Sequence, residues 1–259
     1  MTDTPILELR GVSKSFGAVQ ALYQVDFHVA PGEVMALVGD NGAGKSTLIK
    51  AIAGIHPIDE GEILFEGEPV TIHGPKDSAK LGIEVVYQDL ALCDNLDVVQ
   101  NMFLGREETS SLRRLDETIM EKRASDTLKS LSVTTIRSVR QTVAGLSGGQ
   151  RQSVAVAKAV MWNSKVVILD EPTAALGVAQ TRQVLDLVRR LGEQGLAVVL
   201  ISHNLHDIFE VADTITVLRL GQNVAEYKRT DVTQTQVVEA ITAGALSKVP
   251  GHVEAEVTA

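Results

Sequence analysis

The chain has 259 residues, of which 44% are hydrophobic and only 3% are aromatic, and its formal net charge is −9. This length allows one large domain or two small ones with a sizeable core. The few aromatic side chains and the negative charge argue against a nucleic-acid-binding surface, which needs stacking rings and basic patches.

The single cysteine, Cys93, excludes an internal disulfide bond and fits a reducing compartment. We interpret this lone thiol as a packing residue rather than a redox group. Because no stretch reaches about 18 uninterrupted apolar residues, we expect no membrane-spanning segment. The first residues lack the basic and apolar run of a signal peptide, so we expect none. Any role at a membrane then depends on a partner.

The first third of the chain predicts strands and one helix. Runs that alternate apolar and polar residues, or are continuously apolar, are typical of strands. The predicted helix covers 45–53 and is stopped at Gly54. The predicted strands cover 6–12, 21–29, 34–38, 62–65 and 83–87.

The pattern becomes helical from about 96 to 160, with charged residues between the apolar ones. Strands then return, and 180–191 places apolar residues on one helical face. Alternation of strands and helices predicts a mostly parallel sheet, into which the helical block is inserted. Residues 247–259 show no periodicity and predict a flexible tail. The later predicted strands cover 166–169, 196–201, 215–218 and 223–227.

A glycine-rich loop follows the strand at 34–38 and precedes the helix at 45–53. It matches the pattern G-x-x-x-x-G-K-[ST], whose glycines let the backbone curl around phosphates. Lys45 is expected to reach the β- and γ-phosphates and the Ser46 hydroxyl to bind Mg²⁺, while Thr47 extends the same helix end. The alternative is a chance glycine-rich turn, against which the flanking strand and helix argue. The loop residues are Gly39, Asp40, Asn41, Gly42, Ala43, Gly44, Lys45 and Ser46.

The apolar strand at 166–169 ends in two carboxylates, Asp170 and Glu171. Parallel sheets bind ligands at the carboxyl ends of their strands, so Asp170 can share Mg²⁺ with Ser46. Successive strand residues point to opposite faces. Glu171 therefore need not compete for the ion, and is expected to orient or deprotonate the water that attacks the γ-phosphate.

Two further polar residues follow predicted strands. Gln88 comes after the strand at 83–87, where an amide can touch Mg²⁺ or water. His203 comes two residues after the strand at 196–201, at the same sheet edge, where a donor to the γ-phosphate is needed. His203 and His206 have a helical i, i+3 spacing, but no third ligand accompanies them, which argues against a zinc site.

A second glycine motif opens a long amphipathic segment. Ser147, Gly148 and Gly149 can place free backbone N–H groups and a hydroxyl at a helix N-terminus, which attracts phosphate. A simple helix cap by Ser147 is the alternative, and it is compatible with phosphate binding. Two separate phosphate-seeking helix ends indicate more than simple nucleotide binding.

These motifs, in this order and approximate spacing, resemble the nucleotide-binding subunit of an ABC transporter over about residues 5–243. The resemblance implies an α/β P-loop NTPase (RecA-like) fold with a mostly parallel sheet, an N-terminal antiparallel β subdomain and an inserted helical subdomain. It implies an ATPase domain over 1–246, with the helical subdomain at about 90–162, followed by the tail.

The resemblance also implies a role for each matching residue. Phe16 stands where the family has an aromatic ring that stacks on adenine; the alternative is a buried residue at a strand end. The second glycine motif is the family signature, which contacts ATP held by another copy of the chain, so ATP binding is expected to produce a homodimer. The implied ligands of ATP are Phe16, residues 39–47, Ser147, Gly148, Gly149 and Gln150. The implied ligands of Mg²⁺ are Ser46, Gln88 and Asp170. The implied catalytic residues are Glu171, His203, Gln88 and Lys45.

The resemblance is strongest to the ATPases of bacterial monosaccharide importers of the ribose, xylose and fructose type, and it rests on the runs 169–181 and 103–107. It implies a peripheral protein on the cytoplasmic face of the inner membrane, attached to permease subunits near 88–103. A periplasmic sugar-binding protein is the indirect partner. The identity of the sugar is expected to depend on those partners.

The chain departs from the family pattern at Gly177, where Asp is usual, and at Gln100, where Glu is common. It also has one cassette where many sugar-importer ATPases have two. A non-transport ABC ATPase of translation or DNA repair is the alternative, but tandem cassettes, a basic linker and a long coiled-coil insertion are all missing. A P-loop kinase leaves the signature and His203 unexplained.

Overall fold

The computed structural model describes residues 4–110 and 114–244, so the predicted tail at 247–259 lies outside the described residues. The strands are β1 (Leu7–Phe16), β2 (Val19–Val29), β3 (Val34–Val38), β4 (Glu60–Phe65), β5 (Glu68–Val70), β6 (Ile83–Val86), β7 (Val166–Asp170), β8 (Ala197–Ile201), β9 (Thr214–Arg219) and β10 (Gln222–Lys228). The α-helices are α1 (Lys45–Ile52), α2 (Pro75–Leu81), α3 (Val98–Phe103), α4 (Glu117–Ser130), α5 (Gly148–Val160), α6 (Val178–Glu193), α7 (Leu205–Val211) and α8 (Gln234–Ala243), and the 3₁₀ helices are η1 (Val143–Gly145) and η2 (Arg229–Asp231).

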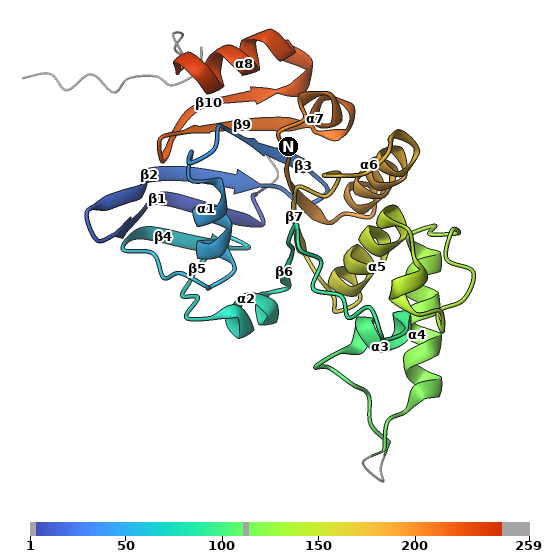
Figure 1. Ribbon diagram of the computed structural model, residues 1–259. Helices are drawn as coiled ribbons and strands as arrows, with labels where there is room; N and C mark the ends of the chain where they lie inside the picture. Colours follow the sequence, from blue (N-terminus) through green and yellow to red (C-terminus); the bar gives the residue numbers. More distant parts are fainter. Residues whose placement is uncertain (1–3, 111–113, 245–259) are drawn as a thin grey trace, which may run out of the picture.

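The strands form two sheets (Figure 1). The larger has the order β10-β9-β3-β8-β7-β6, in which only the β10–β9 pair is antiparallel. The smaller is antiparallel, with the order β2-β1-β4-β5. A mostly parallel core with an N-terminal antiparallel sheet is the arrangement predicted from the sequence.

Alternate residues of the central strands enter two separate apolar cores. In β7, Val166 and Ile168 join a core shared with α1 and the antiparallel sheet. Val167 and Leu169 join the core that contains α5 and α6. Strand side chains alternate between faces, so a sheet covered on both faces has continuously apolar strands. By the same alternation, Asp170 lies on the α1 side at the end of β7.

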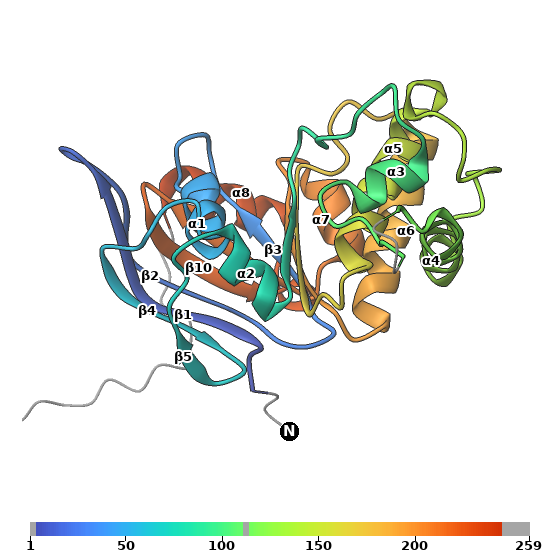
Figure 2. The same cartoon turned by 90° about the horizontal axis from the view of Figure 1, so that it is seen from below.

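The elements between β6 and β7 are all helical. α3, α4 and α5 pack on one another, and Figure 2 shows them beside the two sheets rather than within them. Phe103 and Trp162 form an edge-to-face pair with ring centroids 5.6 Å apart, and the Arg123 guanidinium lies over both rings. This apolar packing gives the inserted block a core that is continuous with α6 and with one face of β7.

Five short elements of the described residues were not predicted from the sequence: β5, α2, α7, η2 and α8. β1 also extends to Phe16, beyond the predicted end, through register shifts in its pairing with β2. No described helix is long and apolar enough to cross a membrane.

Candidate functional site

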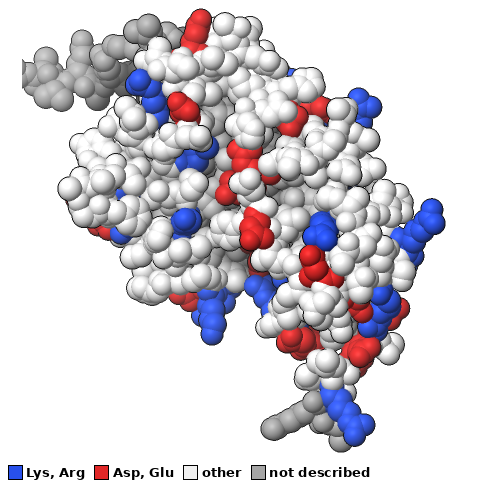
Figure 3. Space-filling view, viewed as in Figure 1, with Lys and Arg blue, Asp and Glu red and all other residues white. Residues whose placement is uncertain are grey.

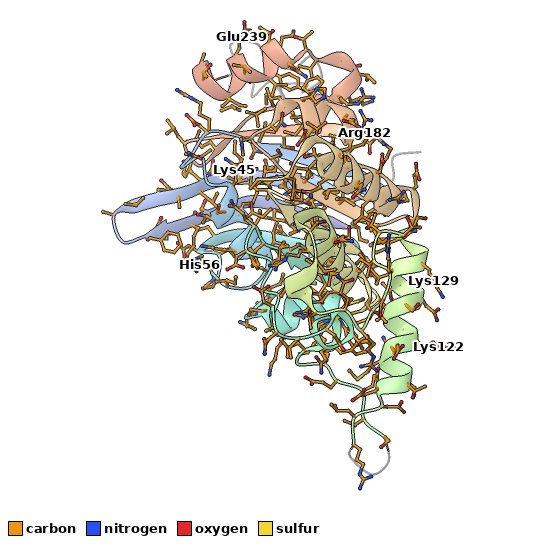
Figure 4. All side chains as sticks on the ribbon, turned by 45° about the vertical axis from the view of Figure 1, so that its right-hand side comes forward. Lys45, His56, Lys122, Lys129, Arg182 and Glu239 are labelled. Carbon is orange, nitrogen blue, oxygen red and sulfur yellow. The ribbon has the colours of Figure 1, made fainter. Side chains whose placement is uncertain are left out.

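A cavity of about 380 Å³ lies where β3 leads into α1. Residues of the glycine-rich loop, the end of β7 and Gln88 all line it. Figure 4 shows Lys45 at the start of α1, on the sheet side of the molecule. The lining residues are Val19, Gln20, Ala21, Asn41, Gly42, Ala43, Gly44, Lys45, Ser46, Thr47, Gln88, Asp170, Glu171 and Ile201.

The loop has its shape because glycines occupy its crowded positions. Gly39 has φ +154°, and a Cβ there would lie 2.2 Å from the Leu218 carbonyl oxygen. Gly44 has φ +103° and caps α1 without a side chain, so the first N–H groups of α1 have no side-chain partner there. An open helix N-terminus of this kind is suited to bind phosphate.

Lys45 is the cation of the cavity. Its Nζ donates to the carbonyl oxygens of Gly39 at 2.6 Å and Asp40 at 3.0 Å, which holds the side chain across the loop. Burial lowers the pKa of the Lys45 ammonium, while Glu171, Asp40 and Asp170 act in the opposite direction. The ammonium therefore lies near these three carboxylates and lines the cavity in which phosphates would bind.

Asp170, Ser46 and Gln88 line the same cavity from β7, α1 and the segment after β6. Burial raises the pKa of Asp170, and Glu171 raises it further, whereas Lys45 and Lys50 lower it. A carboxylate, a hydroxyl and an amide oxygen form a hard-oxygen donor set of the kind that Mg²⁺ prefers. The donors present thus fit a magnesium ion.

Glu171 lies beyond the end of β7, with φ +52°, so strand alternation does not determine its direction. It lines the same cavity as Asp170, and its N–H donates to the Ile201 carbonyl at 2.9 Å. Its Oε2 lies 2.8 Å from Nδ1 of His203. The two side chains thus form a carboxylate–imidazole pair at the cavity edge, with His203 78% exposed.

Phe16 lies at the end of β1 and is 44% exposed, so it is not the buried residue that was the alternative interpretation. Its ring packs edge-on against His56, with centroids 5.1 Å apart, and the Lys14 Nζ lies 5.5 Å from its centroid. It is not among the residues that line the cavity, although Val19, three residues later, is. The structure therefore leaves the Phe16 ring outside the lining of the cavity.

Ser147 is the N-cap of α5 and forms a capping box with Gln150. The Ser147 N–H donates to Gln150 Oε1 at 2.9 Å, and the Gln150 N–H donates to Ser147 Oγ at 3.4 Å. A Cβ at Gly148 would lie 2.8 Å from Leu176, and one at Gly149 would lie 3.1 Å from Gln180. The glycines thus permit the close approach of α5 to the start of α6.

The signature does not belong to the cavity of its own chain. None of the residues from Leu146 to Gln150 lines it, and Ser147 and Gly148 are exposed. The structure therefore brings together residues 41–47, Gln88, Asp170 and Glu171, with His203 in contact through Glu171, whereas Gly39 and Asp40 do not line the cavity. It leaves Ser147 and Gly148 exposed outside that cavity, while Leu146 and Gly149 are buried.

Some cavity residues carry no signal in the sequence. Val19, Gln20 and Ala21 belong to β2, which approaches the loop through Gly221: the Gly221 N–H donates to the Ala43 carbonyl, and the Tyr23 N–H donates to the Gly221 carbonyl. Contacts between segments this far apart depend on the packing of the two sheets, and no local pattern reports them.

The loop geometry predicts the cost of a methyl group at Gly39. Gly39→Ala combines left-handed strain of about 1–2 kcal/mol with a clash that costs about 1–3 kcal/mol more. We expect the free energy of unfolding to fall accordingly in urea titrations. Gly195→Ala is the matched control, since Gly195 has φ +88° but open space where a Cβ would lie. An equal fall in the free energy of unfolding in the two variants would show that the contact with the Leu218 carbonyl does not add to the cost at Gly39.

Comparisons with known proteins agree with this geometry. A family model described as ABC transporter matches residues 22–174. The chain is 48% identical to the fructose import ATP-binding protein FrcA of Rhizobium meliloti over 93% of this chain and 95% of that protein. It is 47% identical to the xylose/arabinose import ATP-binding protein XylG of Sulfolobus acidocaldarius, over 94% and 96%. It is 40% identical to the ribose import ATP-binding protein RbsA of Yersinia pestis over 95% of this chain, which spans 48% of that protein.

Solved structures have the same fold. The ADP conformation of MJ1267, an ATP-binding cassette of an ABC transporter, is 27% identical with a TM-score of 0.78, covering 92% of this chain and 95% of that chain. The dimeric bacterial ABC transporter cassette MJ0796 is 26% identical with a TM-score of 0.72, covering 86% and 98%. These comparisons confirm the predicted fold class, and the chain belongs to the ABC transporter family as one of its ATP-hydrolysing, ATP-binding cassettes.

Proposed function

We propose that this chain hydrolyses ATP with Mg²⁺ to energise the import of a monosaccharide across the cytoplasmic membrane. The observation that carries the proposal is the cavity at the end of β3, which joins the phosphate loop to Asp170, Glu171 and Gln88 in one place. The substrate class is supported by the relatives, which are named fructose, xylose/arabinose and ribose import ATP-binding proteins.

Each site residue takes a role that its position supports. The backbone of residues 39–47 and Lys45 bind the phosphates, and Phe16 stacks on adenine beside the cavity. Ser46, Gln88 and Asp170 hold Mg²⁺, which neutralises phosphate charge when bound. Glu171 accepts a proton from the attacking water, and His203 donates to the γ-phosphate.

We propose two partners, a second copy of the chain at residues 147–150 and a permease near residues 88–103. Ser147, Gly148, Gly149 and Gln150 bind the ATP held by a second copy, so that ATP closes a homodimer with two shared sites. A dimeric cassette structure of this fold supports the arrangement. A permease docks near 88–103, where Gln88 connects the cavity to the helical block, and a periplasmic binding protein delivers the sugar.

We propose domain bounds and a cellular location as well. Residues 1–246 form the ATPase domain, with a helical subdomain at about 90–162, and the permease holds the chain at the cytoplasmic face of the membrane. Nucleic acid is not a partner in this proposal. On the face shown in Figure 3, the described lysine and arginine side chains are interspersed with acidic ones and form no continuous basic surface.

Sugar uptake tests the proposal in cells that lack the chromosomal copy of the gene. Wild-type chain is expected to restore uptake of labelled fructose, xylose or ribose, whereas a Glu171→Gln chain, expressed equally, is not. The control sugar is one that these cells take up by a phosphotransferase route. The non-transport alternative would be established by two results together. The wild-type chain would not raise the uptake of any of the three sugars above that of cells without the gene, and the purified chain would bring down ribosomes rather than a permease.

A further inference from the structure

A buried carboxylate lies behind the Glu171–His203 pair and is not part of the roles assigned above. Asp207 is in the first turn of α7 and is only 3% exposed. No lysine, arginine or histidine forms a salt bridge with it among the described residues. A buried carboxylate without a cation is costly unless hydrogen bonds satisfy it, so its partners define what it does.

Those partners come from two different loops. Thr173 Oγ1 donates to Asp207 Oδ2 at 2.7 Å, and Asn204 Nδ2 donates to Asp207 Oδ1 at 2.9 Å. Thr173 follows β7 and lies two residues after Glu171. Asn204 follows β8 and is the neighbour of His203. The carboxylate therefore spans the two loops that carry the carboxylate–imidazole pair.

The loop after β7 is short and constrained between Glu171 and Thr173. Pro172 between them is buried and has a fixed φ, and the Ala174 N–H donates to the Glu171 carbonyl at 3.1 Å. Glu171 itself has φ +52°. A left-handed conformation is unfavourable for a residue with a side chain, so surrounding contacts must hold it. The Thr173 hydroxyl is the next side-chain anchor along this loop.

The loop after β8 is anchored at the same point. Asn204 Oδ1 accepts from the His206 N–H at 3.1 Å as the N-cap of α7, while its amide nitrogen donates to Asp207. The Asn204 N–H donates to Ser202 Oγ at 3.0 Å, and Ser202 is 3% exposed. His203 is thus an exposed residue between two anchored ones.

We propose that Asp207 is a positioning residue for ATP hydrolysis, which clamps the Glu171 loop to the His203 loop through Thr173 and Asn204. The Asp207 carboxylate at the centre of the clamp is buried, whereas Thr173 is half-buried and Asn204 is exposed. The clamp acts through Glu171 and His203 and touches no substrate. The inference rests on the proposed catalytic roles of those two residues.

Thr173→Val tests the clamp, because it removes one hydroxyl with little change of shape. We expect kcat for ATP hydrolysis by the full chain to fall about tenfold, equivalent to about 1.4 kcal/mol in the barrier. KM for ATP is expected to stay within about twofold, since the phosphate loop is untouched. Thr173→Ser keeps the hydroxyl and is expected to stay within about twofold of the wild-type kcat.

Thr216→Val is the control for the loss of a threonine hydroxyl that contacts another side chain. Thr216 is 1% exposed in β9, and its hydroxyl contacts the Met35 sulfur at 3.2 Å, away from both loops. We expect it to change the melting temperature without changing kcat. If Thr173→Val does not fold, Asn204→Asp tests the other arm, because it keeps the cap acceptor and replaces the donor amide. It is expected to lower kcat at least tenfold, equivalent to at least about 1.4 kcal/mol.

The outcomes separate the clamp from the proposed function. Wild-type kcat in folded Thr173→Val and Asn204→Asp chains, with an inactive Glu171→Gln chain, would overturn the clamp and leave the proposed function intact. Wild-type kcat in Glu171→Gln would overturn the role of Glu171 itself. Equal loss of kcat in Thr173→Val and Thr216→Val would reduce the effect to general destabilisation and would also overturn the clamp.

Discussion

Glu171→Gln is expected to lower kcat for ATP hydrolysis by about 10² to 10⁴, the range that a general base contributes. The amide keeps the size of the side chain and its place beside His203, but it does not accept a proton from water. KM for ATP is expected to change little, because the phosphate loop and Lys45 are intact. Phosphate release and nucleotide binding, measured on the same preparation, separate the two effects.

Glu239→Gln provides the control for the loss of one negative charge. Glu239 is exposed on α8, at the far end of the molecule from the helical block (Figure 4), and its substitution is expected to leave turnover unchanged. Turnover of Glu171→Gln within a few-fold of wild type would exclude Glu171 as the base. Loss of ATP binding in this variant would instead indicate a structural role for Glu171 in the loop.

Ser147→Arg is expected to abolish hydrolysis while leaving ATP bound to the phosphate loop of the same chain. The signature does not line that cavity, so the arginine is remote from its own nucleotide. In the proposed homodimer, however, the long side chain occupies the surface that receives the partner's ATP. The lost helix cap costs about 1 kcal/mol, which the fold is expected to tolerate.

Ser130→Arg is the matched control, because Ser130 is also an exposed serine, but it ends α4 rather than beginning α5. We expect its hydrolysis rate to remain at the wild-type level. A Ser147→Arg chain that hydrolyses ATP at the wild-type rate would show that one chain carries a complete site. A loss of nucleotide binding by that chain would show that the substitution disturbs the fold.

The position of the glycine-rich loop between a strand and a helix was predictable, because adjacent residues determine it. β3 has the predicted bounds, and the glycine positions follow from backbone shape alone. The helix at 45–52 and the strand at 166–170 differ from prediction by one residue each, as expected where helix and strand ends are set by local hydrogen bonds.

Short elements were harder to predict because few apolar residues establish a period in them. α7 has seven residues and α2 has seven, which is about two turns each. Signals for two of the missed helices were nevertheless present: Pro75 begins α2, and Thr233 with Gln236 forms a capping box before α8. Cap patterns therefore locate helices that hydrophobic periodicity does not.

The geometry of the Glu171–His203 pair was not predictable from local pattern. The alternation argument assumed that Glu171 continues β7, but the chain turns into a left-handed conformation there. Its contact with His203 and the Thr173–Asp207 bond join residues 32 and 34 positions apart in the chain. Such contacts depend on the parallel pairing of β7 with β8, and only the folded sheet brings them together.

Light scattering of the Glu171→Gln chain, with and without ATP, tests whether two copies share each nucleotide. Because this variant is expected to bind ATP without turnover, ATP should convert it from the mass of one chain to about twice that mass. The same variant carrying Ser147→Arg should keep the mass of one chain at saturating ATP. A Glu171→Gln chain that binds ATP and remains a monomer, or a double variant that dimerises equally well, would contradict the shared site.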